Sequence, residues 1–182
     1  MEIRRATPAD ASAIAAIYAH YVRDTAITFA TVAPTAEDYA ARIADDRYPF
    51  LVAEEAGCVS GFMYAAAFRQ KEAYRWDVEL TIYLAPGHEG RGTGSALMAA
   101  CLRILAAQGY LNAYSCITLP GERSIGLHRR FGFEELGVFR KTGYKSGAWH
   151  DVVWMGRTLG DLGAVPAEVR PVSEVWNTLN AL

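Results

Sequence analysis

The sequence predicts one α+β domain with a mixed, mostly antiparallel central sheet flanked by helices. The chain has 182 residues, which is enough for one well-buried core and too few for two ordinary domains. Hydrophobic residues make up 52% of the chain, so it can build such a core. Two hairpin signals precede any strand–helix–strand unit, and this order favours antiparallel pairing over a doubly wound parallel sheet.

Charge and composition exclude several classes of protein. The formal net charge is −2 and no run of like charge stands out, so we expect no nucleic-acid partner and no anionic membrane surface. The N-terminus turns polar within a few residues, and no window approaches a membrane-spanning helix. Cys58, Cys101 and Cys116 lack metal-ligand spacing, so we expect three reduced, mostly buried thiols, no metal site and a cytoplasmic protein.

The first half of the chain contains clear start signals for helices. Thr7 followed by Pro8 and Asp10 is typical of a helix cap with proline at the first position and a carboxylate in the first turn. Apolar residues then recur at helical spacing from Ile14 to Tyr21. The expected strands here are 2–6, 50–54, 59–65 and 76–84; the expected helices are one after Thr7 and one over 36–44, joined by a loop over 24–34.

The second half continues the alternation of helices and strands. Leu97, Met98, Cys101 and Leu105 form one apolar stripe, and Gly109 follows as a C-cap. The expected helices are 93–108 and 122–130, and the expected strands are 110–119, 133–139 and 149–155. From residue 158 to 182 the sequence is rich in Gly, Pro and Ala and predicts a loosely packed tail.

A glycine-rich segment lies between the strand that ends at Leu84 and the helix that begins at Thr93. Gly90, Gly92 and Gly94 stand at alternate positions, where the lack of side chains lets a ligand approach the backbone. The N-terminus of the following helix offers unpaired N–H groups and a partial positive charge, which together suit a phosphate. The sequence therefore predicts an anion site here, although a glycine-rich turn that binds nothing remains open.

Three phosphate-binding motifs are candidates for this loop. A Walker A loop requires a lysine after its last glycine, and Ser95 stands there. A dinucleotide loop has the spacing GxGxxG, whereas this chain has GxGxG. The third pattern, Q/R-x-x-G-x-G/A, holds the pyrophosphate of coenzyme A in the GNAT N-acetyltransferases; Gly92 and Gly94 match its glycines, and Glu89 replaces its Gln or Arg.

Further segments in the same order resemble the GNAT superfamily, and within it the phosphinothricin and methionine sulfoximine N-acetyltransferases. The resemblance implies a GNAT domain over 1–157, a tail over 158–182, and a homodimer. The segments that carry it are Arg4–Asp10, Tyr48–Glu54, Ala73–Trp76, Glu79–Leu84, Ser124–Phe133, Gly143–Val152 and Arg170–Val175.

The resemblance implies that acetyl-CoA is the co-substrate and assigns roles along the binding strand and loop. The expected cofactor-binding residues are Ile82, Tyr83, Leu84, Gly90, Arg91, Gly92, Thr93, Gly94, Ser95 and Ser124. Gly121 stands where family members often carry an Asn that contacts pantetheine, so Ser124 or the backbone of residues 120–121 is expected to serve instead.

Two residues are expected to carry the chemistry. The resemblance implies that Glu79 is the general base that removes the ammonium proton, directly or through water. His128 is implied as the acid for the CoA thiolate or as a partner of Glu79. From the residues alone, Glu79 can equally be a solvent-facing strand carboxylate and His128 a packed or surface residue.

The acceptor side resembles that of enzymes acting on small amino-acid analogues, whose anionic groups require cations and whose aliphatic parts require aromatic walls. Arg69 and Lys71 can also be solvated loop charges. The expected acceptor-binding residues are Phe29, Arg69, Lys71, Tyr74, Tyr83 and Lys145. The alternatives are an acyl-CoA-binding module without turnover, for which neither Glu79 nor His128 is needed, and an acetyltransferase for another amine.

Overall fold

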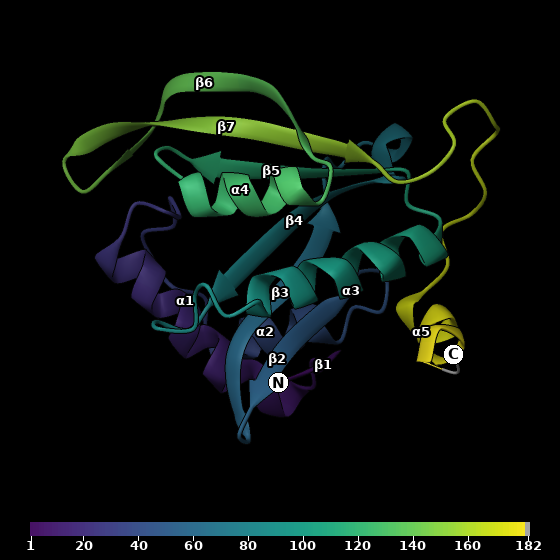
Figure 1. The fold of residues 1–182 in the computed structure, drawn as a ribbon, viewed down its shortest axis with the longest axis horizontal. Helices are drawn as coiled ribbons and strands as arrows, with labels where there is room; N and C mark the ends of the chain where they lie inside the picture. The colour runs from purple at the N-terminus through teal and green to yellow at the C-terminus, as the bar shows by residue number, and fades with distance from the viewer. Residues whose placement is uncertain (181–182) are drawn as a thin grey trace.

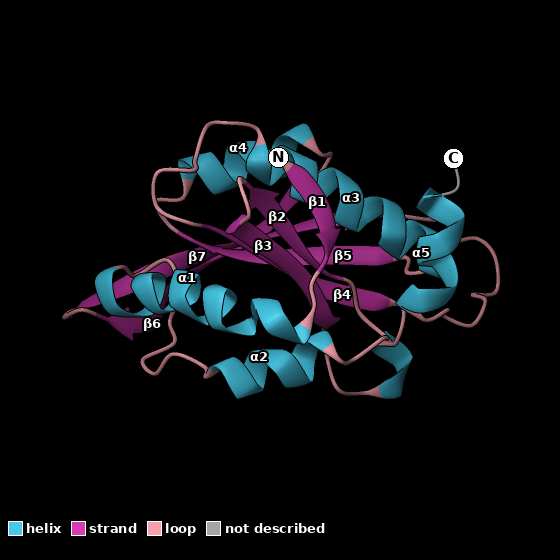
Figure 2. Ribbon diagram, turned by 90° about the horizontal axis from the view of Figure 1, so that it is seen from below, coloured by secondary structure: helices cyan, strands magenta, loops and turns pink. Residues whose placement is uncertain are grey.

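The computed structural model describes residues 1–180 and contains one seven-stranded sheet between two layers of helices (Figure 2). Its strands follow the order β1-β2-β3-β4-β5-β7-β6 (Figure 1). All neighbouring strands are antiparallel except the pair of β4 and β5. The expected α+β architecture is confirmed. The strands are β1 (Glu2–Arg5), β2 (Phe50–Glu55), β3 (Cys58–Ala67), β4 (Asp77–Leu84), β5 (Asn112–Thr118), β6 (Glu134–Lys145) and β7 (Ala148–Thr158).

The helices divide between the two faces of the sheet. One face packs on α1 and α2 around Ile14, Tyr39 and Phe62, and the other packs on α3 around Leu97, Met98 and other residues. Short 3₁₀ turns occur at Pro8–Asp10 and Glu72–Tyr74. The helices are α1 (Ala11–Asp24), α2 (Ala36–Ile43), α3 (Thr93–Gln108), α4 (Glu122–Arg130) and α5 (Val172–Asn180).

Local sequence signals explain several helix ends. The Asp10 carboxylate accepts hydrogen bonds from the Thr7 N–H at 2.7 Å and the Thr7 hydroxyl at 2.9 Å, as the cap predicts. Helix α3 ends at Gly109, which adopts the left-handed conformation with φ of 97°. Its two bounds agree with the sequence prediction, because a glycine stands just outside each end.

Two expectations about packing are wrong. The tail is not loosely packed throughout: within its described part, α5 packs against α3 and buries Val172 and Val175. Two of the three cysteines are exposed rather than buried: Cys58 at the start of β3 and Cys116 on β5, whereas Cys101 is buried in α3. The division at residues 157 and 158 stays a prediction. Among the described residues, no helix is long and apolar enough to cross a membrane.

Candidate active site

The central feature of the site is an opening between β4 and β5. Their parallel pairing comprises Asp77–Asn112, Val78–Ala113 and Glu79–Tyr114. Beyond this point β4 stays paired with β3 up to Leu84, and β5 stays paired with β7 up to Thr118, while β4 and β5 diverge (Figure 1). Main-chain groups of residues 80–84 that face β5 are therefore available to a ligand.

The two strands are tied to helices on opposite faces of the sheet. On β4, the Leu84 carbonyl accepts a hydrogen bond of 2.8 Å from the Tyr21 hydroxyl of α1. On β5, the Ser115 hydroxyl lies 2.9 Å from Nε2 of His128 on α4. Each contact therefore fixes one of the two strands to its own helix, on opposite sides of the opening.

The glycine-rich loop lies at the far end of β4. Gly87, Gly90 and Gly92 have positive φ values of 84°, 75° and 88°, which other residues adopt only with strain. Helix α3 begins at Thr93 without a side-chain cap, so its first N–H groups remain open to an anion. Glu89, which departs from the usual motif, accepts a hydrogen bond of 3.0 Å from the Gly87 N–H within the loop.

Close packing joins this loop to the strand. A Cβ atom on Gly94 would lie 3.4 Å from the Leu127 side chain, 3.8 Å from Ile82 and 3.9 Å from Leu84. These are ordinary van der Waals distances, so the first turn of α3 packs against β4 and α4 at this position. Arg91 and Ser95 lie in the same loop and first turn. Of the predicted cofactor-binding residues, Gly94 thus lies beside Ile82 and Leu84 of the strand.

Glu79 lies where the opening begins and is partly buried. Burial raises the pKa of its carboxyl, and the positive charge of Arg69 opposes this rise. Side chains alternate between the two faces along a strand, so Glu79 lies on the same face of β4 as Thr81 and Tyr83. Because a raised pKa strengthens a carboxylate as a base, the environment of Glu79 suits proton abstraction.

Cys116 faces the same opening from the other strand. It stands two residues beyond Tyr114, the partner of Glu79, and therefore on the same face of the sheet. Its thiol is exposed, but surrounding protein and, to a smaller extent, the charge of Glu79 raise its pKa to about 11. At neutral pH it is therefore a thiol, not a thiolate. Sequence reasoning missed Cys116 because only the strand pairing brings it to the site.

Both ring nitrogens of His128 form hydrogen bonds. Its side chain is buried, with Nδ1 2.8 Å from the Ser124 carbonyl and Nε2 2.9 Å from the Ser115 hydroxyl. A carbonyl only accepts, so Nδ1 donates and the neutral ring accepts from Ser115 at Nε2. Burial lowers the pKa of His128, and its bond to Ser124 opposes this. The ring is thus neutral at pH 7.

Gly121 and Ser124 are placed differently from a pantetheine-binding Asn. A Cβ atom on Gly121 would lie 2.6 Å from the Ile117 side chain and 2.7 Å from the Thr118 carbonyl. An Asn therefore does not fit here without movement of β5. The Ser124 carbonyl is occupied by His128. The predicted contact of Ser124 with the cofactor stays a prediction.

The predicted acceptor residues lie in two groups. Lys145 is buried and its Nζ donates to the Thr28 carbonyl at 2.7 Å, and Phe29 packs near Gly143 and His150. These two join the loop after α1 to the β6–β7 hairpin. Arg69, Lys71 and Tyr74 lie in and around the β3–β4 connection, where the Arg69 guanidinium stacks 4.1 Å from the Phe68 ring centroid.

A cavity of about 360 Å³ lies beside Glu79 on the face covered by α2. We call it the α2 pocket. None of the acceptor residues expected from the sequence lines it. Its walls combine aromatic rings, a small-residue floor, one arginine and two carboxylates. The lining residues are Arg42, Asp45, Tyr48, Phe50, Tyr64, Ala65, Ala66, Ala67, Glu79 and Thr81.

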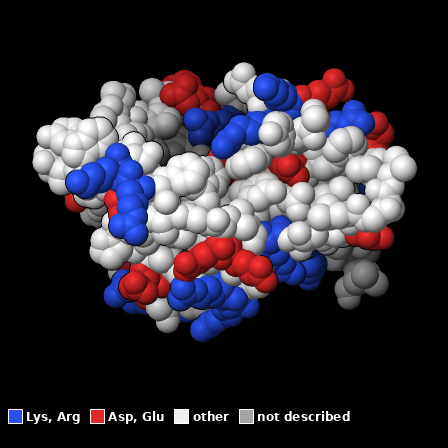
Figure 3. Space-filling model, turned by 90° about the horizontal axis from the view of Figure 1, so that it is seen from above, with Lys and Arg blue, Asp and Glu red and all other residues white. Residues whose placement is uncertain are grey.

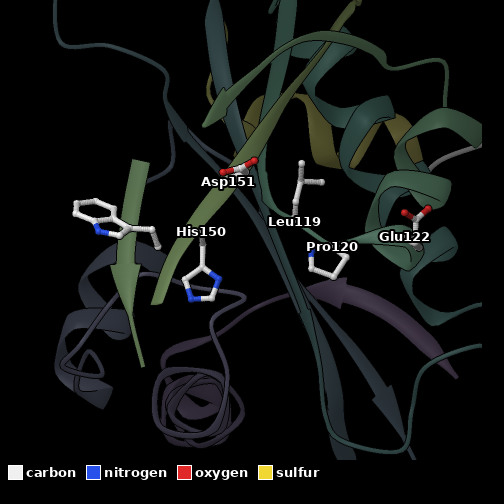
Figure 4. Close-up of a pocket in the computed structure, with 6 residues that line it drawn as sticks. Leu119, Pro120, Glu122, His150 and Asp151 are labelled. Atoms are coloured by element: carbon white, nitrogen blue, oxygen red, sulfur yellow. The ribbon is translucent and has the colours of Figure 1, made fainter. Parts of the chain in front are cut away.

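A second hollow of about 450 Å³ lies at the other end of β5. Figure 4 shows His150 and Asp151 of β7 on one side of it and Leu119, Pro120 and Glu122 on the other. It contains neither Glu79 nor the glycine-rich loop. Among residues 1–180, no group of three or more His, Cys, Asp or Glu side chains is arranged to hold a metal ion.

The fold and the opening define an acyltransferase, and comparison with known proteins identifies the family. The acetyltransferase (GNAT) domain family matches residues 3–154. A phosphinothricin N-acetyltransferase of Streptomyces viridochromogenes is 38% identical over 177 residues, covering 96% of each chain. The chain therefore belongs to the GNAT acetyltransferase family, and it is an N-acetyltransferase that uses acetyl-CoA.

Two further relatives are also named as acetyltransferases. An L-methionine sulfoximine/L-methionine sulfone acetyltransferase of Pseudomonas aeruginosa is 36% identical, covering 90% of this chain and 98% of its own. The crystal structure of a phosphinothricin acetyltransferase from Sinorhizobium meliloti in complex with AcCoA has a TM-score of 0.88 and 36% identity. It covers 94% of this chain and 96% of that chain.

The conformation of Gly92 provides a test of the loop. Ala at Gly92 has room for its Cβ but must adopt a φ of 88°, which costs about 1–2 kcal/mol. We expect Gly92→Ala to displace the N–H groups at the start of α3 and to weaken acetyl-CoA binding, measured by calorimetry.

Gly57 supplies the matched control. It also has a positive φ, of 79°, and open space around it, but it lies in the β2–β3 turn. Gly57→Ala should lose similar stability and keep the affinity for acetyl-CoA. Equal affinities of the two variants would show that the loop does not bind the pyrophosphate.

Proposed function

We propose that this enzyme acetylates the amino group of a small, amino-acid-like acceptor such as phosphinothricin or methionine sulfoximine. The observation that carries the proposal is the position of Glu79, at the start of the β4–β5 opening and at the wall of the α2 pocket. A carboxylate there adjoins both the expected thioester and a cavity for the amine. The names of the relatives support the acceptor class.

In the proposed reaction Glu79 takes the ammonium proton of the acceptor, directly or through water, and the free amine attacks the thioester carbon. The backbone of Ile82, Tyr83 and Leu84 orients the pantetheine, and residues 90–95 hold the pyrophosphate. We propose that Arg69, with Lys71 and Tyr74, contacts the acceptor from the β3–β4 side, because the Arg69 charge already acts on Glu79. Phe29, Tyr83 and Lys145 form the opposite wall.

We propose that His128 acts on the leaving group through Ser115. A neutral imidazole whose two nitrogens are both engaged is a poor direct acid at neutral pH. It can, however, fix the direction of the Ser115 hydroxyl, which stands on β5 next to the last residue paired with β4. His128 is then a positioning residue that fixes Ser115 and this part of β5 beside the thioester, and the leaving thiolate takes its proton from the ammonium nitrogen that forms when the amine attacks.

We also propose a homodimer formed through the outer strand β6. This strand lies at the sheet edge, and Leu136, Val138 and Phe139 are 59%, 45% and 56% exposed. An antiparallel pairing of two copies of β6 across a two-fold axis brings the acidic pair 134–135 of one copy toward the basic pair 140–141 of the other. Figure 3 views this side of the molecule, where a broad region without charged side chains separates small groups of both signs.

We place the enzyme in the cytoplasm, where its exposed cysteines Cys58 and Cys116 stay reduced. This location also fits its dependence on acetyl-CoA. The first experiment is thiol release from acetyl-CoA with phosphinothricin, methionine sulfoximine, methionine sulfone and common amino acids. Binding of acetyl-CoA without release in the presence of any amine would favour the non-catalytic alternative.

The general base gives the sharpest kinetic prediction. Glu79→Gln keeps size and removes the proton acceptor, so kcat/KM at pH 7 should fall by about 10²–10⁴-fold. The loss should shrink as pH rises, because free amine becomes plentiful. The same substitution also affects stability. Burial raises the pKa of Glu79 in the folded state, so ionisation of this carboxyl at neutral pH lowers the free energy of unfolding. The variant should therefore be at least as stable as the wild type at pH 7. Wild-type kcat/KM in the variant at pH 7 would remove Glu79 from the mechanism.

The role of His128 is tested with His128→Phe, Ser115→Ala and the double variant. If His128 acts through Ser115, the two single changes should lower kcat by similar factors and the double change should add little. The loss should be smaller than that of Glu79→Gln, since a thiol with a pKa of about 8.5 needs only weak acid assistance. Independent, multiplicative losses, or an unchanged kcat with a lower melting temperature, would contradict this role.

The dimer is tested by sedimentation. The wild type should sediment as a dimer at micromolar concentration, and Phe139→Glu should produce a monomer because it places a charge in the apolar centre of β6. Val165→Glu is the control, since Val165 is 94% exposed in the tail. A monomeric wild type would overturn the proposal.

A further inference from the structure

Of the charged side chains that line the α2 pocket, some form an ion pair with an opposite charge and others do not. The Asp45 carboxylate forms an ion pair with Arg47 at 2.8 Å, and this contact lowers the pKa of the Asp45 carboxyl. The negative charge of Asp45 is therefore already neutralised by Arg47. Arg42 has no carboxylate within 4.0 Å among the described residues. The pocket therefore holds one guanidinium without an acidic partner, together with Glu79.

Aromatic groups hold this guanidinium in place. Nη1 of Arg42 donates to the Tyr64 hydroxyl at 3.1 Å, and the guanidinium carbon lies 5.6 Å from the Tyr39 ring centroid and 5.7 Å from that of Tyr64. Tyr39 is buried, and Tyr64 stacks on Phe50 at 4.9 Å. An arginine positioned in this way loses less conformational entropy when it binds an anion.

The sheet register fixes the position of Tyr64, the hydrogen-bond partner of Arg42, relative to Glu79. Tyr64 pairs with Thr81, and Ala66 pairs with Glu79, so Tyr64 and Glu79 are diagonal neighbours on one face. Diagonal neighbours of this kind lie about 7–8 Å apart, and their Cβ atoms are somewhat closer. Only the small side chain of Ala66 stands beside Glu79 on β3. Arg42 and Glu79 both line the α2 pocket of about 360 Å³, which has room for the aliphatic part of a short amino acid.

We infer that the α2 pocket is the acceptor's side-chain subsite and that Arg42, held by Tyr64, binds an anionic group at the end of that side chain. The inference rests on the proposed function, because it takes the acceptor amine to lie at Glu79. A phosphinate or carboxylate presents two oxygens to the planar fork of a guanidinium. Arg69, on the other side of Glu79, remains free for the α-carboxylate.

The decisive comparison uses two acceptors with the same α-amino and α-carboxylate groups. Phosphinothricin carries an anionic side-chain group, and methionine sulfone carries an uncharged one of similar size. Arg42→Gln should raise the KM for phosphinothricin by about 10–100-fold, as expected for lost charge-assisted hydrogen bonds. The KM for methionine sulfone and the KM for acetyl-CoA should stay unchanged.

Three further variants complete the test. Tyr64→Phe should raise the KM for phosphinothricin less than Arg42→Gln, because the guanidinium remains but loses one fixed partner. Arg42→Lys should restore part of the lost affinity, since it keeps the charge. Arg103→Gln removes an arginine of α3, outside the α2 pocket, and should change neither KM.

The outcomes separate this inference from the proposed function. If the wild type acetylates neither compound, the proposed function fails. If it acetylates both and Arg42→Gln raises the two KM values equally, or raises neither, the assignment of Arg42 to the side-chain anion is overturned while the function stands. Melting temperatures of the variants show whether a loss reflects folding, and equilibrium binding of phosphinothricin to the folded variant then provides a readout independent of turnover.

Discussion

Strands β4 and β5 stop pairing at Glu79 and Tyr114, and the rest of the site depends on this separation. Unpaired strand edges inside a sheet are costly unless another group satisfies them. Here each strand keeps its other neighbour, β3 for β4 and β7 for β5. The open main-chain groups are then limited to one short gap. A ligand with amide groups of its own, such as pantetheine, can satisfy them.

The separation of β4 and β5 also places the proposed phosphate site and Glu79 at opposite ends of the gap. The glycine-rich loop and the start of α3 lie at the end of β4, where an anion is stabilised by N–H groups. Glu79 lies at the opposite end of the opening, where burial raises its pKa. A molecule bound at both places has its phosphates at the loop and its acyl group near the base. In our proposal the α2 pocket, lined by Glu79, receives the amine that this carboxylate activates.

The sequence predicted the parts that depend on local signals. The glycines on both sides of α3 mark its bounds, and the resemblance of Glu79–Leu84 and the glycine-rich loop pointed to acetyl-CoA as the co-substrate; that these segments bind it stays a prediction. The bonds of His128 to Ser115 and Ser124 were not predictable, because they depend on how α4 lies on β5. Arg42 was missed for a related reason: on an exposed helix its spacing resembles that of a solvated charge, and only the packing of α2 over β3 brings it to Tyr64. The burial of α5 likewise depends on contact with α3 rather than on the composition of the tail.

Hydrogen–deuterium exchange with and without acetyl-CoA shows whether this ligand binds in the gap between β4 and β5. Exchange reports the opening and solvent access of individual main-chain amides. If acetyl-CoA fills the gap between the strands, amides of residues 80–84 on β4 and 90–95 at the start of α3 should become protected together, and those of the outer strand β6 should not change. Protection elsewhere, with residues 80–84 exchanging as in the free enzyme, would show that acetyl-CoA does not bind between β4 and β5.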